Sequence, residues 1–180
     1  MRIAVYCSAR ADIPEIYHDD ARALGAWIGR NGHTLVYGGL SLSMMGDVAH
    51  AAAVNGAKVI GLVPRARLQL QSPDNTVSIL VETLHERKQM MEENADTFVA
   101  LEGGIGTLDE LFAALASSTF SGEPRQVHLL DRDGLYEPLR LLLEKMHSLG
   151  LVNAGTLECI HFHDSPEALC TALELSLIHI

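Results

Sequence analysis

The sequence predicts an α/β protein in which a mostly parallel sheet lies between two layers of helices. Short apolar runs rich in β-branched residues alternate along the chain with longer segments whose apolar residues recur at helical spacing. The short runs are nearly continuous in apolar residues, as expected of strands that are buried on both faces of a parallel sheet. With 180 residues, of which 48% are hydrophobic and 20% charged, the chain has the size and composition of one globular domain.

The elements are expected in a regular order. Strands are predicted at residues 2–7, 33–37, 58–62, 76–81, 97–101, 126–130 and 157–162. Helices are predicted at about 14–30, 45–55, from 84, 108–117, 136–149 and at the C-terminal end, with a polar loop over 64–75. Such alternation produces parallel pairing through right-handed crossovers, so we expect a Rossmann-like three-layer sandwich that forms a single nucleotide-binding domain over residues 1–180.

The charge balance and the cysteines limit the expected partners. The formal net charge of −10 disfavours a nucleic-acid polymer, which requires clustered Lys and Arg. No apolar run approaches the roughly 20 residues that cross a bilayer, and the apolar start of the chain turns polar at once, unlike a secretory signal. Cys7, Cys159 and Cys170 are widely spaced and predict reduced thiols. We therefore expect a cytoplasmic protein with no membrane partner.

Three turns that lead from a strand to a helix are predicted to form a phosphate pocket. Glycine lets an anion approach backbone N–H groups closely, and the N-terminus of a helix adds roughly half a positive charge. These turns meet at the carboxyl edge of the sheet, where ligands bind in such folds. The expected phosphate-binding residues are Ser8, Gly38, Gly39, Ser43, Lys88, Gly103, Gly104, Gly106 and Thr107. The alternative is that the glycines only make tight turns.

The glycine spacing also limits which nucleotide could bind. The turns do not match Gly-x-Gly-x-x-Gly, and no glycine is followed by Lys-Ser or Lys-Thr. Both a dinucleotide cofactor and the phosphate loop of nucleoside triphosphatases are therefore disfavoured, and no cofactor is expected.

Two charged residues near these turns are candidates for chemistry. Arg87 lies in the first turn of its predicted helix, at the unfavourable end of the helix dipole, so an anion is expected to compensate it. The alternative is a solvated surface arginine. Glu110 follows Thr107 at the spacing of a capping box, as Glu86 follows Thr83, and could serve as a cap only or as cap and catalyst together. Asp109 is expected to face solvent.

Other candidate chemistry is weak. His161 and His163 would share one face of a strand, but two ligands without a third do not predict a metal site. Tyr6 and Tyr37 are expected to pack at the edges of the core. The chain has no Gly-x-Ser-x-Gly nucleophile motif, and neither Lys58 nor Lys88 has the surroundings of a Schiff-base lysine.

Four motifs together carry a resemblance to a known family: Tyr37-Gly38-Gly39, Met45-Gly46, His85-Glu86-Arg87-Lys88 and Gly103-Gly104-Ile105-Gly106-Thr107-Leu108-Asp109-Glu110. In this order and spacing they resemble the LOG family, the cytokinin riboside 5′-monophosphate phosphoribohydrolases, which have also been called lysine decarboxylases. The resemblance extends from the first strand to about residue 150.

This resemblance implies a Rossmann-like homodimer that hydrolyses the N-glycosidic bond of AMP-type nucleotides to a free base and ribose 5-phosphate. It implies that Arg87 and Glu110 form the catalytic pair and that residues 103–107 form the phosphate loop. Nothing in the residues supports a decarboxylase.

The sequence departs from the family pattern in three places. Glu102 stands where the family usually has proline, and a carboxylate that faced the pocket would repel phosphate. The second turn has less glycine than usual, so Leu40 and Ser43 are expected to narrow the site. The first turn has Cys7-Ser8-Ala9-Arg10, where Gly-Ser is commoner.

The leading hypothesis is therefore a nucleoside 5′-monophosphate glycosidase. Glycine-turn amides and Thr107 would hold the phosphate with help from Ser8 or Ser43, while Glu110 would stabilise oxocarbenium-like charge or activate water. Arg87 would orient Glu110 or bind an anionic part of the substrate. A non-catalytic nucleotide-binding or carrier protein is the alternative, favoured by Glu102 and the reduced second turn, and an interaction module is a third option.

Overall fold

The structure, a computed structural model, describes residues 1–121 and 125–177, so the expected domain 1–180 includes two short segments that lie outside it. Within the described residues, one sheet has the strand order β4-β3-β2-β1-β5-β6-β7, and every pair is parallel. Its strands are β1 (Arg2–Tyr6), β2 (Thr34–Tyr37), β3 (Lys58–Pro64), β4 (Val77–Val81), β5 (Thr97–Ala100), β6 (Val127–Leu130) and β7 (Ile160–His163). The predicted parallel sheet is confirmed.

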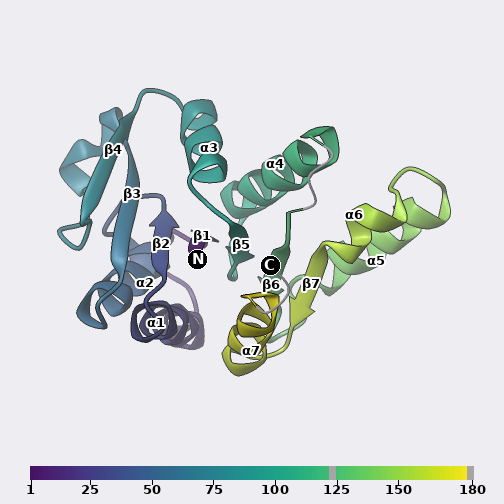
Figure 1. The fold of residues 1–180 in the computed structure, drawn as a ribbon, viewed down its shortest axis with the longest axis horizontal. Coiled ribbons are helices and arrows are strands. Elements are labelled where there is room, and N and C mark those ends of the chain that lie inside the picture. The colour runs from purple at the N-terminus through teal and green to yellow at the C-terminus, as the bar shows by residue number, and fades with distance from the viewer. Residues whose placement is uncertain (122–124, 178–180) are drawn as a thin grey trace.

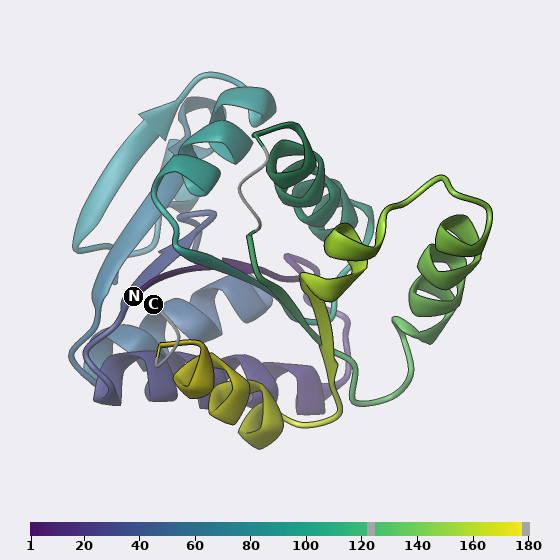
Figure 2. The same ribbon diagram turned by 45° about the vertical axis from the view of Figure 1, so that its right-hand side comes forward.

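Helices cover both faces of this sheet, as Figures 1 and 2 show. One layer consists of α1 (Glu15–Arg30), α2 (Ser43–Val54) and α7 (Pro166–Leu177). The other consists of α3 (Leu84–Glu93), α4 (Ile105–Ser121), α5 (Glu137–Ser148) and the short α6 (Ala154–Glu158). A 3-10 helix, η1 (Arg65–Leu70), lies within the segment predicted as a polar loop. The three-layer sandwich is therefore also confirmed.

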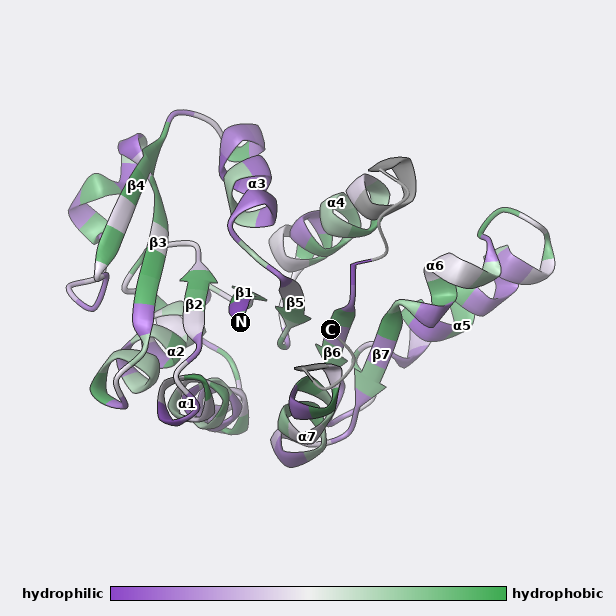
Figure 3. Ribbon diagram, viewed as in Figure 1, coloured by the Kyte–Doolittle hydropathy of each residue, from purple (hydrophilic) through white to green (hydrophobic). Residues whose placement is uncertain are grey.

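The core is divided by the sheet into two halves, and β1 contributes to both. Ile3 and Val5 point into the half beneath α1 and α2, whereas Ala4 and Tyr6 point into the half beneath α3 and α4. This alternation follows from the two-residue period of a strand. Because both faces are covered, the central strands are apolar over most of their length (Figure 3).

Several element boundaries differ from the prediction, and two of these differences have a clear local cause. The segment that begins at Leu157 was predicted as a strand, but Leu157 belongs to α6 and the strand starts at Ile160. Asn153 explains this, because its side chain accepts a hydrogen bond from the Thr156 N–H at 2.8 Å and so caps a helix. The second difference is that α4 begins at Ile105 rather than about 108, so Gly106 lies in its first turn while Gly103 and Gly104 precede it.

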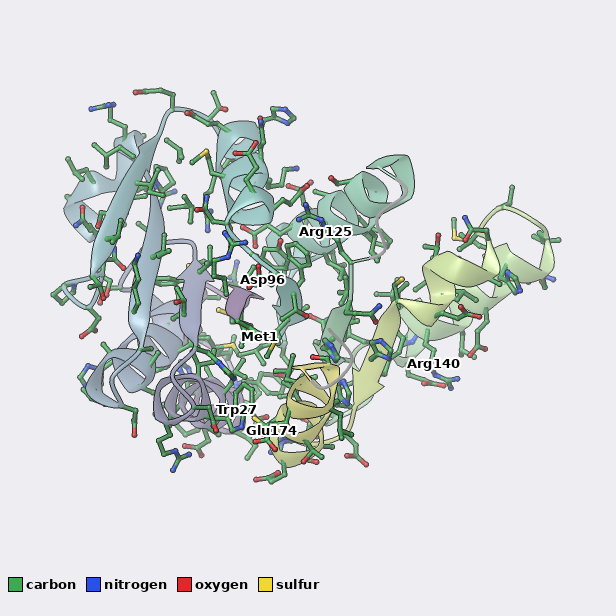
Figure 4. The ribbon with its side chains drawn as sticks, in the orientation of Figure 1. Met1, Trp27, Asp96, Arg125, Arg140 and Glu174 are labelled. Atoms are coloured by element: carbon green, nitrogen blue, oxygen red, sulfur yellow. The ribbon has the colours of Figure 1, made fainter. Side chains whose placement is uncertain are left out.

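Helix α7 is attached to the body through α1. The Trp27 indole donates a hydrogen bond to Glu174 at 3.0 Å, and Figure 4 shows the two side chains together beneath the sheet. Leu169 and Leu173 of α7 are buried in the same half of the core. These contacts place α7 beside α1 on the same face of the sheet, next to β6 and β7.

The strand order also determines where a ligand can bind. The chain adds β2, β3 and β4 on one side of β1, then returns to place β5 on the other side. Such folds bind ligands at the carboxyl ends of the two strands where the direction of winding reverses. Here the turns after β1 and β5 are joined directly, since the Ser8 N–H donates to the Glu102 carbonyl at 3.2 Å. No helix among the described residues has the length and apolar character to cross a membrane.

Candidate active site

Helix α3 presents Arg87 from its first turn. The Thr83 side chain accepts a hydrogen bond from the Glu86 N–H at 3.1 Å, so the predicted cap of this helix is confirmed. Glu86 accepts in return from the Glu82 N–H at 2.6 Å, one residue before the position that a standard capping box uses. The side chains of Thr83 and Glu86, which the sequence indicated, therefore both accept hydrogen bonds at the start of α3.

Arg87 is buried, with only 9% of its surface exposed, so the alternative of a solvated arginine is wrong. Its Nη2 atom lies 3.4 Å from Glu110 Oε1. The guanidinium occupies space beside Gly38, where a β-carbon would come within 1.8 Å of Nη2. The Arg87 Nε atom is buried and has no hydrogen-bond partner among the described residues. The Arg87 guanidinium is therefore the point where α3, α4 and the turn after β2 come together.

Glu110 lies in the second turn of α4 and does not cap this helix. The Gly104 carbonyl accepts from the Leu108 N–H at 3.1 Å, so Gly104 is the residue before a helix that begins at Ile105, and Thr107 is the third helical residue. The predicted capping box of Thr107 and Glu110 is therefore wrong, because Thr107 already lies inside the helix. With a side chain only 12% exposed, Glu110 instead faces Arg87.

The electrostatics of this pair reflect its burial. Burial raises the pKa of Glu110 above its usual value, although the positive charges of Arg87 and Lys88 oppose this effect. The neighbouring Tyr6 and Cys7 are also buried, and burial together with the Glu110 charge raises the pKa of each. Glu110 is therefore a carboxylate whose affinity for a proton is increased, as general acid–base chemistry requires.

A second ion pair connects the same two helices. Lys88 Nζ lies 2.7 Å from Asp109 Oδ1, in the position where the sequence predicted a phosphate ligand. Asp109 is exposed, as expected. The ammonium group already has a carboxylate partner, so Lys88 in this structure joins α3 to α4, and its predicted role toward phosphate stays a prediction.

The glycines before α4 differ in what they do. A β-carbon on Gly103 would lie 2.0 Å from Thr107 Oγ1, so this glycine allows the Thr107 side chain to fold back and become buried. At Gly104 and Gly106 a β-carbon would meet no atom within 4 Å, and neither residue has a positive φ. Packing therefore gives no reason for glycine at these two positions, whereas the close approach of an anion to the free first-turn amides would.

The second turn is largely occupied by structural contacts. Gly39 has a φ of +77°, which favours glycine, and its carbonyl accepts from the Ser72 N–H at 3.0 Å and from Asn75 Nδ2 at 3.1 Å. Ser43 donates from Oγ to the Arg10 carbonyl at 2.5 Å and so joins this turn to the first one. Leu40 is buried in the core, and the expectation that it narrows the site is wrong.

A cavity of about 160 Å³ lies between the first turn and the start of α4. Its lining residues come from the turns after β1 and β5, from α1 and from the segment before α5: Ser8, Arg10, Ile13, Tyr17, Glu102, Gly103, Gly104 and Leu135. The structure thus brings the predicted residues Ser8, Gly103 and Gly104 to one place. Tyr17 and Leu135 were missed by the sequence analysis, because apolar helical spacing and a loop leucine give no signal of a site.

Glu102 lines this cavity and is almost completely buried, with 1% of its surface exposed. Neither of its carboxyl oxygens has a hydrogen-bond partner among the described residues. Burial, with a smaller contribution from the Asp20 charge, raises the pKa of Glu102 to about 7. The carboxyl group that departs from the family pattern therefore borders the predicted phosphate turn.

The other sequence candidates lie elsewhere. Tyr6 and Tyr37 are buried in the core, as expected. His163 pairs with His128 across a 3.0 Å nitrogen–nitrogen distance, while His161 Nε2 lies 2.6 Å from Gln126 Oε1. Over residues 1–121 and 125–177, no group of three His, Cys, Asp or Glu side chains is arranged to hold a metal ion.

Comparison with known proteins identifies the family of this chain. A family model described as "Possible lysine decarboxylase" matches residues 45–173, which include α3, the Gly103 turn and Glu110. The chain is 37% identical over 158 residues to a cytokinin riboside 5′-monophosphate phosphoribohydrolase of Mycobacterium marinum, covering 87% of this chain and 84% of that protein. The chain belongs to the LOG family. A second LOG protein, LOG2 of Arabidopsis thaliana, is 33% identical over 155 residues, or 85% of this chain and 73% of that protein.

Solved structures show that the LOG fold is shared more widely. The molybdenum cofactor carrier protein of Chlamydomonas reinhardtii superimposes with a TM-score of 0.79 at 22% identity and covers 98% of both chains. The molybdenum cofactor binding protein of Rippkaea orientalis gives a TM-score of 0.75 at 24% identity, over 98% of this chain and 96% of that one. At this level of identity the likeness shows the fold alone.

Proposed function

We propose that this LOG family member hydrolyses the N-glycosidic bond of nucleoside 5′-monophosphates of the AMP or cytokinin riboside type, releasing a free base and ribose 5-phosphate. The observation that carries the proposal is the buried pair of Arg87 and Glu110, 3.4 Å apart beside the glycine start of α4. Relatives that are 33–37% identical bear the name of this activity.

The geometry suggests which residues would bind the phosphate and which would act on the glycosidic bond. The free first-turn amides of α4 and Thr107 would bind the 5′-phosphate, with Ser8 at the other wall of the cavity. Glu110 would then face the ribose, where it stabilises positive charge at C1′ or removes a proton from the attacking water as the C1′–N bond breaks. The departing base leaves with a proton, and C1′ retains the hydroxyl from water.

Arg87 would have two tasks. Its Nη2 holds the Glu110 carboxylate, while its buried Nε–H has no acceptor among the described residues. A buried donor without an acceptor is costly, and a substrate oxygen would satisfy it. The lysines give no comparable support to a decarboxylase, because Lys58 is exposed and Lys88 is already paired with Asp109.

The test is to incubate the purified protein with AMP and with isopentenyladenosine monophosphate and to measure released base. Glu110→Gln, which preserves the size of the side chain, is expected to lower turnover by about 10²-fold or more. Glu158→Gln, the same change at an exposed position on α6, is the matched control and should leave turnover unchanged.

Wild-type protein that released base no faster than an Arg87→Ala, Glu110→Ala double variant would contradict the hydrolase. Nucleotide binding without base release would instead select the carrier alternative. We further propose that the protein acts in the cytoplasm, where its free Cys7, Cys159 and Cys170 would stay reduced, and that it is a homodimer.

A further inference from the structure

The cavity beside the Gly103-Gly104 turn combines groups that attract an anion with one that repels it. Ser8, Arg10 and the two glycines line one part of it, so a hydroxyl group, a cation and a helix N-terminus all border the same 160 Å³. Glu102 lines it as well, with both carboxyl oxygens unpartnered among the described residues. A buried polar group without a partner calls for an explanation, and a ligand would provide one.

The charged groups around Glu102 do not supply that partner. Arg132, from the turn after β6, is already paired with Asp20 of α1 through Nε–Oδ2 at 2.9 Å and Nη2–Oδ1 at 2.5 Å. The Asp20 charge also acts against ionisation of Glu102. The Arg132 charge favours ionisation, as do the nearby backbone N–H groups of Glu102 and Arg132, although neither N–H group reaches hydrogen-bond geometry with the carboxyl oxygens. The net result of burial and these charges is a raised Glu102 pKa of about 7.

Two tyrosines and one further cationic side chain also lie near Glu102 or line the same cavity. Tyr136 donates its hydroxyl proton to the Leu101 carbonyl at 2.7 Å, so it is not free to serve Glu102. Tyr17 of α1 lies near both Asp133 and Glu102, and these carboxylates raise its pKa in addition to burial. Arg10 is an exposed side chain at the cavity wall, and its N–H donates to Ser8 Oγ at 3.1 Å. No group among these neutralises the Glu102 carboxyl directly.

A phosphate can bind beside this carboxyl group only if the two groups share a proton. An ionised Glu102 would face a phosphate anion across a poorly screened cavity, and the two would repel each other. A protonated Glu102 can donate its O–H to a phosphate oxygen, and a monoanionic phosphate can equally donate its own O–H to the carboxylate. Both routes lead to the same complex, which contains one shared proton.

We propose that Glu102 couples binding at the phosphate subsite to a proton, so that the 5′-phosphate binds together with one proton shared between the Glu102 carboxyl and a phosphate oxygen. The inference rests on the proposed function for the location of the phosphate. It assigns a role to the residue that departs from the family pattern. Proline at this position has no group that could hold the proton, so the pH dependence is a property of this chain.

The experiment is calorimetric titration with ribose 5-phosphate, a phosphate ester that the proposed reaction cannot cleave. Titrations between about pH 6 and 9, each in two buffers of different ionisation enthalpy, give both Kd and the number of protons taken up. For the wild type, Kd is expected to rise about tenfold per pH unit above the pKa of Glu102, with close to one proton taken up per ligand near pH 8. Glu158→Gln is the matched control and should behave as the wild type does.

Glu102→Gln retains a donor but does not titrate, so its Kd is expected to stay flat over the same range with no proton uptake. Glu102→Pro, which places the usual family residue there, should also give a flat profile and serves as the second variant if the first folds poorly. Equal proton uptake by the wild type and either folded variant would overturn the proposal. So would wild-type binding without uptake, or no binding of ribose 5-phosphate at any pH.

Base release from AMP, measured in parallel, separates the two proposals. Base release without proton-linked binding would leave the hydrolase standing and remove the role of Glu102. Proton-linked binding of ribose 5-phosphate without base release would support the phosphate subsite and contradict the hydrolase.

Discussion

Arg87 occupies the space that a β-carbon on Gly38 would fill, and this contact explains part of the glycine pair after β2. Gly39 is required by its own backbone, since it has a φ of +77° and a β-carbon there would lie 2.7 Å from Val63 Cγ2. Gly38 has no such requirement and is small because the guanidinium lies against it. The two adjacent glycines therefore have different causes, one in the main chain and one in the Arg87 side chain.

Gly38→Ala is expected to lower turnover by at least about tenfold and to destabilise the protein by about 1–3 kcal/mol. The added methyl group would overlap Arg87 Nη2, which is the far end of a flexible side chain and would have to move away from Glu110, so that the pair is separated. Steady-state kinetics and thermal unfolding measure the two effects. Gly155→Ala on α6, where a β-carbon meets nothing closer than 3.4 Å, is the control, and full turnover in Gly38→Ala would show that the contact is unimportant.

Arg87 lies on α3 and Glu110 on α4, so the position at which each helix begins determines where the two side chains meet. Thr83→Ala is expected to destabilise the protein by about 1 kcal/mol, because the Glu86 N–H would lose its acceptor. Turnover should also fall, since the Arg87 N–H donates to the Thr83 carbonyl in the same turn. Asn153→Ala removes the cap of the distant α6 and should cost similar stability in urea unfolding at unchanged turnover. If the two variants had equal turnover, the cap at the start of α3 would not be needed to position Arg87.

At this scale the sequence predicted most of the fold. Apolar periodicity identified each strand, and Thr83 located the start of α3. The start of α4 was misplaced because glycine signals a loop in sequence, whereas Gly104 here accepts the first helical hydrogen bond. That error produced the false cap at Glu110.

The candidate site was predicted less completely, for a similar reason. The sequence singled out Arg87 and Glu110, but the contact of Arg87 with Gly38 and the cavity around Glu102 depend on which turns the strand order places side by side. Tyr17 belongs to that cavity because α1 packs beneath the same edge, and spacing along the chain gives no signal of such a position.

The whole molecule leaves large apolar side chains uncovered next to the site. Leu84 is 66% exposed and Ile105 is 84% exposed, at the first residues of the two helices that bear Arg87 and Glu110. Exposed apolar side chains at a functional edge suit an interface, which supports the proposed homodimer.

Light scattering after size exclusion is expected to give twice the chain mass of 19.5 kDa. Leu84→Asp should shift the protein toward the monomer, because it places a charge in the proposed interface. Leu149→Asp, at an equally exposed leucine just beyond α5, should remain dimeric. A monomeric wild type would contradict the dimer, and loss of the dimer only in Leu149→Asp would place the interface elsewhere.

The two ion pairs between α3 and α4 differ in how ionic strength should affect them. Lys88 and Asp109 meet where the Asp109 side chain is 54% exposed, so dissolved ions can screen their attraction. Arg87 and Glu110 are buried, and counterions reach them poorly. Added salt should therefore loosen the outer link between the helices while the inner pair keeps its geometry. The inner pair would keep its arrangement across a wider range of saline conditions than a surface pair could.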